Sequence, residues 1–264
     1  MEKKLEETLE DFKKYLASKS LSHISIENYA FTVKLYIKFD RDIIKLLSRN
    51  ISNNTRRLYY YSLKHYYDFT GEPFKLTKPP NMKRRLPETL KQEEIDRLFK
   101  FNPSKPKMIL AKKAIYIILS CGLRISELIN LRFSDIDFLE RSLFIKGKGG
   151  KERKVYFPQI LDPMIQSLNP CLQGHLFHWN GEVFNRGYLS SLIKLYARKL
   201  GIKLYPHKLR HTFAFQMLKN GADIVTIQKL LGHASLETTQ IYLNLKQDYV
   251  KEIYEKCNPM IPQD

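Results

Sequence analysis

The segment that most restricts the fold lies near the C-terminal end of the chain, at residues 203–244. Within it, residues 223–231 repeat apolar side chains at helical spacing, which predicts an amphipathic helix. Asp223 is a suitable N-cap for this helix and Gly232 a suitable stop. His233 would then lie at the helix end instead of on the apolar face. The apolar stripe consists of Ile224, Ile227, Leu230 and Leu231.

The same segment gathers side chains that suit a phosphate group. His207 and Arg210 are three residues apart, so on a helix they project from one face. Tyr242 follows His233 by nine residues. A guanidinium group matches phosphate oxygens in a bidentate way, and a tyrosine hydroxyl can serve as a nucleophile. A tyrosine that cleaves a phosphodiester would need this arrangement.

The chain carries a formal charge of +18, from 45 Lys and Arg against 27 Asp and Glu. Residues 1–85 and the remainder are both basic, so the charge does not come from one tail. This balance favours nucleic acid as the partner, with an acidic membrane surface as the second choice. No apolar run has the length of a membrane span and the N-terminus does not resemble a signal peptide, so we expect no membrane insertion.

Three cysteines are present, Cys121, Cys171 and Cys257, and no two of them form a C-x-x-C pair. Their odd number and their spacing indicate neither a disulfide framework nor a zinc site. We therefore expect a reduced, cytoplasmic protein that needs neither a metal nor another cofactor.

Residues 1–72 are expected to form a small helical domain. Apolar spacing predicts a first helix that ends near Lys19 and a second that is capped by Ser25. A short helical piece at residues 42–47 and a helix over residues 54–69 complete the predicted domain.

The helix over residues 54–69 is dense in both basic and aromatic residues, and two interpretations stay open. In the first, the tyrosines form the core and the cations a solvated face. In the second, cations interleaved with tyrosines grip a phosphate backbone. The candidate DNA-binding residues of this helix are Arg56, Arg57 and Lys64.

Residues 73–88 contain four prolines and no helical periodicity, which predicts an extended linker. If the two domains clamp opposite faces of a duplex, the basic residues of this linker would lie along the DNA. These candidates are Lys83, Arg84 and Arg85.

Residues 89–264 are expected to form the second domain, which begins with a capping box at residues 89–92. Helices are predicted over residues 92–101, 107–121 and 189–200, and residues 174–186 are expected to be a loop. Strands are predicted over residues 135–138, 142–146 and 153–157, with a glycine-rich turn between the last two. The predicted fold class is mainly α, with a small helical N-terminal domain and a larger, mostly helical domain that carries a small three-stranded antiparallel sheet.

Four short motifs now identify a family. They are C-G-L-R-I-S-E-L at residues 121–128, H-K-L-R-H-T-F-A at residues 207–214, L-L-G-H at residues 230–233 and T-T-Q-I-Y at residues 238–242. In this order the chain resembles the tyrosine recombinase (phage integrase) family, and it is most similar to the compact Xer-type members. The resemblance covers nearly the whole chain. It implies a core-binding domain at residues 1–72 and a catalytic domain at residues 89–264.

The resemblance also implies roles for single residues. Tyr242 would be the nucleophile, and Arg124 and Arg210 would clamp the scissile phosphate. An alternative for Arg124 is to cap a helix or to pair with Glu127. His207 and His233 would bind the phosphate or assist proton transfer.

Lys148 would be the general acid that protonates the leaving 5′-hydroxyl group. Lys146 and Lys151 lie close by in the sequence and are rivals for this role. His211 is expected to point elsewhere on the helix and to be structural.

The function implied by the resemblance is site-specific recombination of DNA through a covalent 3′-phosphotyrosine, without metal or ATP. The partners would be a double-stranded recombination site and other copies of the chain, in a tetramer on synapsed DNA. Chromosome-dimer resolution and mobile-element integration both fit. Two alternatives are type IB topoisomerase-like cutting and rejoining, and a catalytically silent DNA-binding protein.

After Tyr242, residues 246–257 predict another amphipathic helix. It would pack either on its own domain or on a neighbouring subunit. The apolar face consists of Tyr249, Val250, Ile253 and Tyr254.

Overall fold

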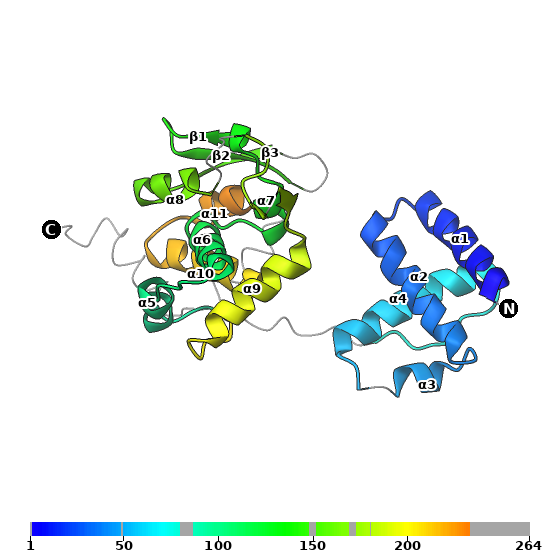
Figure 1. The fold of residues 1–264 in the computed structure, drawn as a ribbon. Helices are drawn as coiled ribbons and strands as arrows, with labels where there is room; N and C mark the ends of the chain where they lie inside the picture. Colours follow the sequence, from blue (N-terminus) through cyan, green and yellow to red (C-terminus); the bar gives the residue numbers. More distant parts are fainter. Residues whose placement is uncertain are drawn as a thin grey trace, which may run out of the picture. The chain divides into compact units, whose positions relative to one another are not determined.

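A computed structural model describes residues 2–48, 50–79, 87–147, 152–168, 173–179 and 181–232 of the chain. The chain divides into two compact units, an N-terminal unit Met1–Arg84 and a C-terminal unit Arg85–Asp264 (Figure 1). We describe each unit by itself. Among the described residues, no helix combines the length and the apolar character that crossing a membrane requires.

The N-terminal unit is built from helices α1 (Glu2–Ser18), α2 (His23–Lys38), α3 (Ile43–Leu47) and α4 (Asn53–Thr70). Helix α2 packs against both α1 and α4. Helix α4 ends at Gly71, whose φ of 73° is left-handed. The core between these helices is apolar and aromatic, and its buried members are Leu9, Phe12, Leu16, Val33, Tyr36, Leu46, Tyr59, Leu63 and Tyr66.

The predicted cap of the second helix was wrong by one turn. Ser22 is the N-cap of α2, and its Oγ accepts a hydrogen bond from the Ser25 backbone N–H at 3.3 Å. Ser25 lies inside the first turn, where its own N–H needs an acceptor from the preceding turn. Two serines three residues apart each resemble a cap in the sequence, and only the backbone conformation distinguishes them.

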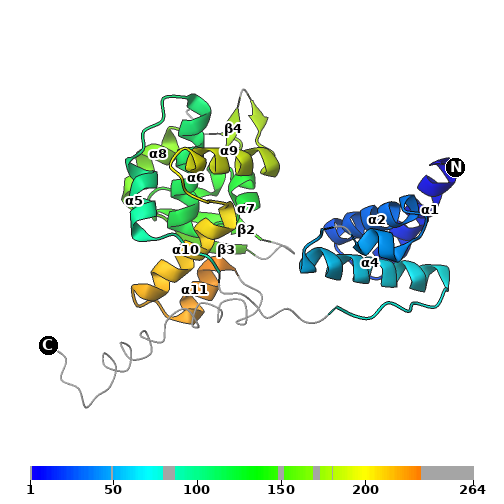
Figure 2. The ribbon, with the colours of Figure 1, turned by 90° about the horizontal axis from the view of Figure 1, so that it is seen from below.

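The C-terminal unit is organised around α6 (Pro106–Cys121), which packs against both α9 (Arg186–Arg198) and α10 (Pro206–Lys219). Helix α6 is buried along much of its length, and alanines at positions 111 and 114 allow close approach of its neighbours. The unit also contains α5 (Gln92–Lys100), α7 (Ile125–Asn130), α8 (Asp162–Gln166) and α11 (Ile224–Leu231). Figure 2 shows α10 and α11 as neighbouring helices at one side of the unit.

The predicted three-stranded antiparallel sheet is confirmed. It consists of β1 (Ile136–Asp137), β2 (Ser142–Lys146) and β3 (Glu152–Tyr156), in the order β1-β2-β3. In Figure 1 this sheet lies on the opposite side of the unit from α5. In β2, burial alternates from Leu143 to Lys146, because neighbouring residues of a strand point to opposite faces.

Two predictions in this unit were wrong. Residues 174–186 contain a short hairpin of β4 (His178–Trp179) and β5 (Glu182–Val183), whose strands are too short to show periodicity. Helix α5 starts at Gln92 as predicted, but the predicted capping box at residues 89–92 lies two residues too early. Lys91 is its N-cap, and its N–H donates to the Glu94 carboxylate at 2.8 Å. The N–H of buried Leu90 donates to Thr212 Oγ1 at 2.8 Å, which holds the preceding residues outside the helix.

Candidate functional site

The loop between α6 and α7 brings the first candidate arginine to the site. Gly122 ends α6 with a left-handed φ of 65°, and Arg124 is the N-cap residue of α7. A Cβ atom at position 122 would lie 2.5 Å from a ring carbon of Phe213 on α10. Glycine is therefore required there twice, for the backbone conformation and for the close approach to α10.

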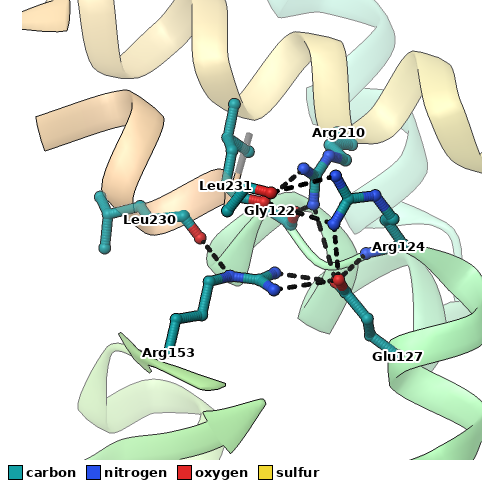
Figure 3. Close-up of polar contacts among 8 residues, drawn as sticks. Gly122, Arg124, Glu127, Arg153, Arg210, Leu230 and Leu231 are labelled. Carbon is teal, nitrogen blue, oxygen red and sulfur yellow. Dashed lines mark hydrogen bonds and ion pairs between the residues drawn. The ribbon is translucent and has the colours of Figure 1, made fainter. Parts of the chain in front are cut away.

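Glu127 is the centre of the polar cluster shown in Figure 3. Its carboxylate accepts hydrogen bonds from the Arg124 backbone N–H at 2.8 Å and from the Arg124 guanidinium at 2.7 Å. It also accepts two hydrogen bonds from the Arg153 guanidinium, at 2.9 and 2.8 Å. Burial by itself opposes ionisation of this carboxyl, but the bonds from Arg153, followed by those from Arg124, lower its pKa to about 2. Glu127 is therefore an anion that orients two arginines.

Arg210 on α10 joins the same cluster from the other side. Its side chain is only 5% exposed, and one guanidinium nitrogen lies 3.7 Å from the Glu127 carboxylate. It donates to the carbonyl oxygens of Gly122 at 2.7 Å and of Leu231 at 2.5 Å. A buried guanidinium must have its donors satisfied, and these carbonyls fix its position between α6 and α11.

The C-terminus of α11 is held by arginines from three other elements. Arg153 donates to the Leu230 carbonyl, and Arg210 and Arg124 both donate to the Leu231 carbonyl. Arg124 also reaches the carbonyl of Gly232, at 3.4 Å. The last carbonyls of a helix lack intrahelical donors and carry partial negative charge, so cations are favourable there. The chain is thereby fixed immediately before His233.

The cluster has an excess of positive charge. Among the described side chains, three guanidinium groups share the single Glu127 carboxylate, so the cations around it outnumber the anion. The Arg124 side chain is 33% exposed, whereas those of Arg153 and Arg210 are 10% and 5% exposed. An anion from solvent would therefore meet Arg124 first, with the field of the two buried arginines behind it.

His207 lies one turn before Arg210 on α10. Partial burial, followed by the charges of Arg210, Arg186 and Arg124, lowers the pKa of His207 below its ordinary value. The imidazole is thus favoured in its neutral form, which has one donor and one acceptor. The proximity of Arg186, the first residue of α9, adds a further cation to the surroundings of this histidine.

His211 does not point away from the site as expected. It lies one turn after His207 on α10, and the two ring centroids are 6.4 Å apart. Burial, then the proximity of His207 and Arg210, lowers the pKa of His211 to about 4. Positions i and i+4 share a helix face, so the sequence spacing from His207 was the signal that could have placed it.

The structure brings together three of the candidate catalytic residues, Arg124, His207 and Arg210, from two different segments. The alternative role of Arg124 is also present, because it pairs with Glu127 while part of its guanidinium stays exposed. Lys146, a rival for the general acid, is exposed at the end of β2. The other candidates lie outside the described residues, and they are Lys148, His233, Tyr242 and the rival Lys151.

The candidate DNA-binding residues of the predicted fourth helix lie on α4, in the N-terminal unit. Arg56 and Lys64 are exposed and Arg57 is partly buried, whereas Tyr59 and Tyr66 are in the core. This arrangement fits the first interpretation, and DNA binding by these cations stays a prediction. Of the candidate linker residues, Lys83, Arg84 and Arg85 lie outside the described residues.

Sequence reasoning missed Arg153 as part of the site, and it gave Glu127 only as an alternative partner of Arg124. A signal for Arg153 existed, because strand alternation puts it on the same face as the apolar Val155. Such an inward arginine requires a buried partner. Within the described ranges, no group of three His, Cys, Asp or Glu side chains is placed to hold a metal ion.

Comparison with known proteins gives a consistent result. The model of the phage integrase family matches residues 88–248. The chain is 35% identical to tyrosine recombinase XerA of Pyrococcus furiosus, over 96% of this chain and 94% of that protein. A crystal structure of XerA recombinase has 28% identity and a TM-score of 0.57, covering 97% of this chain and 99% of that one. The XerH recombinase bound to a difH substrate shares the fold, with 21% identity and a TM-score of 0.68 over 91% of this chain and 82% of that one.

Proposed function

Because the chain belongs to the phage integrase family and is a tyrosine-type site-specific recombinase, we propose that it cuts and rejoins DNA through a covalent 3′-phosphotyrosine formed by Tyr242. The observation that carries this proposal is the cluster of Arg124, Arg153 and Arg210 around Glu127. It presents one partly exposed guanidinium fork, that of Arg124, in front of two buried guanidinium groups, which suits a phosphate diester.

In the proposed reaction, the phenolic oxygen of Tyr242 attacks the scissile phosphorus. The bond from phosphorus to the 5′-oxygen breaks, and the leaving oxygen takes a proton from Lys148. Arg124 and Arg210 neutralise the non-bridging oxygens while negative charge develops on them. The phosphotyrosine ester conserves the energy of the broken bond, so a 5′-hydroxyl group can reverse the step without ATP or metal.

The histidines have supporting roles in this proposal. A neutral His207 can donate one hydrogen bond to a phosphate oxygen, or accept the tyrosine proton. The arginines that hold the α11 carbonyls would place His233 beside the same phosphate, since it directly follows Gly232 in the chain.

The proposed partners are a double-stranded recombination site and further copies of this chain, in a tetramer in the cytoplasm. A related recombinase is known in complex with its difH substrate, which supports DNA as the partner. Residues 1–72 would form one half of a clamp and residues 89–264 the other, joined by the linker 73–88. The proposed DNA contacts outside the catalytic cluster are Arg56, Arg57, Lys64, Lys83, Arg84 and Arg85. Both chromosome-dimer resolution and mobile-element integration remain proposed roles.

Covalent capture tests the chemistry and finds the target together. The full chain is incubated with fragmented chromosomal DNA of its own host in EDTA, and denaturant stops the reaction. Protein-linked fragments are then isolated and sequenced. We expect a small number of loci, with protein attached to a 3′ end through Tyr242, and no attachment by the Tyr242→Phe variant.

The outcomes separate the alternatives. An adduct formed by Tyr242→Phe would rule out this nucleophile, and a strict need for Mg²⁺ would rule out the metal-free mechanism. Adducts scattered over all sequences, with relaxation of supercoiled plasmid but no exchange between two sites, would indicate a topoisomerase. Specific binding without any adduct would indicate the silent DNA-binding protein.

A further inference from the structure

Arg153 occupies a position of β3 that faces the core. In the antiparallel register it is paired with Ile145, and the next pair on this face is Leu143 with Val155. These three neighbours are apolar and at most 2% exposed. A charged side chain in such a row is unfavourable unless all of its polar groups find partners.

The Arg153 guanidinium finds these partners on two other elements, as Figure 3 shows. Two of its nitrogens donate to the two Glu127 oxygens on α7, at 2.9 and 2.8 Å. Its Nε donates to the Leu230 carbonyl at the end of α11, at 2.8 Å. One side chain therefore connects the sheet to α7, whose N-cap is Arg124, and to the C-terminal end of α11.

The glycine that follows Leu231 is adapted to this contact. A Cβ atom on Gly232 would lie 2.9 Å from Arg153 Cδ and 3.0 Å from one of its terminal nitrogens. The L-L-G-H motif thus needs glycine for its left-handed φ of 63° and also for the approach of Arg153.

Arg153 and Arg124 differ in how they are held. Arg124 reaches the Leu231 and Gly232 carbonyls at 3.5 and 3.4 Å and is 33% exposed, so a phosphate can replace these weak bonds. The Arg153 bonds to Glu127 and Leu230 are all below 3.0 Å, and its side chain is 10% exposed. This geometry excludes Arg153 as the first contact of an incoming phosphate.

We propose that Arg153 is a positioning residue of the recombinase site, which orients Glu127 and the end of α11 and, through them, Arg124 and Arg210. This inference rests on the proposed function. A buried ion pair seldom stabilises a fold more than apolar residues of the same volume would. The arginine in this apolar row is therefore explained by the geometry that it imposes on the site.

The test uses the full chain and a nicked duplex that carries the locus found by covalent capture. We compare Arg153→Met with Lys154→Met, a neighbour on the outer face of β3 that pairs with Glu140 instead. For Arg153→Met we expect about a 100-fold slower adduct formation, the usual effect of a small misplacement of catalytic groups. DNA affinity should stay unchanged, and Lys154→Met should behave like the unsubstituted chain.

Two further readouts separate positioning from general stability. In Arg153→Met, Glu127 keeps Arg124 and Arg210 as charged neighbours but loses the partner that lowers its pKa most, so adduct formation should acquire an acid limb. That limb should disappear in the Arg153→Met/Glu127→Gln double variant. The loss caused by Arg153→Met should also be much smaller in the Glu127→Gln background, because residues that act as a unit are non-additive.

If Arg153→Met does not fold, Arg153→Lys carries the test. It keeps the charge but cannot bridge Leu230 and both Glu127 oxygens, so its adduct rate should also fall. A normal rate in either folded variant, or equal losses of rate and affinity, would overturn the inference while the unsubstituted chain still forms its adduct. Failure of the unsubstituted chain to form any adduct would overturn the proposed function, and this inference with it.

Discussion

Gly122→Ala tests whether the approach of the α6–α7 loop to α10 limits this fold. The φ of 65° at this position costs a residue with a side chain about 1 kcal/mol. The new Cβ would also lie 2.5 and 2.6 Å from two ring carbons of Phe213 and 3.0 Å from Leu231 Cδ2. Overpacking of this kind costs about 1–3 kcal/mol more.

Gly201→Ala is the matched control, because it isolates the backbone cost. Gly201 has nearly the same φ, 67°, and a Cβ there would meet no described atom within 4 Å. We therefore expect Gly122→Ala to be more destabilising than Gly201→Ala by about 1–3 kcal/mol, the overpacking cost alone.

The assay is urea unfolding followed by the fluorescence of the single tryptophan, Trp179, which reports on the C-terminal unit. In the Gly122→Ala background, Phe213→Leu should cost less than in the original chain, since it removes the clashing ring atoms. Equal destabilisation by the two alanine variants would refute the close contact with Phe213.

Four further predictions concern the site and its partners. The pKa of Glu127 is depressed from 4.5 to about 2, so its stabilisation is complete above pH 4.5 and is lost as the pH falls through 2. Glu127→Gln should abolish this pH dependence, which amounts to about 3 kcal/mol in the free energy of unfolding measured with urea. Lys148→Ala should cleave normal DNA slowly but recover on a substrate with a 5′-bridging sulfur, and equal impairment on both would assign the proton to another group. DNA binding by the full chain should weaken steeply with salt, since phosphate contacts release counterions, and a flat titration would argue against a phosphate-based interface. Deletion from Asp248 onward should spare binding by one subunit but abolish cooperative assembly and strand exchange; a truncated chain that recombines normally would contradict docking on a neighbour.

Much of the secondary structure follows from local signals in the sequence. Helix α11 begins after Asp223 and ends at Gly232 as predicted, because a cap and a left-handed glycine act within a few residues. Strands β2 and β3 were also predictable, because two short runs flank the glycine-rich turn at residues 147–150. The caps of α2 and α5 were not predictable, because a competing serine or a distant acceptor such as Thr212 decides them.

The sequence by itself determined the two helical parts, the small sheet and the residue types that a phosphate site needs. Spacing along the chain also placed His207 and Arg210 on one helix face, since helical geometry fixes that relation. Only the tertiary structure decided that Glu127 also holds Arg153, and that three arginines hold the end of α11. These partners are far apart in sequence, and a buried ion pair leaves no local pattern because its members come from different elements. The physical reason is that each buried charge must be satisfied wherever the fold puts it.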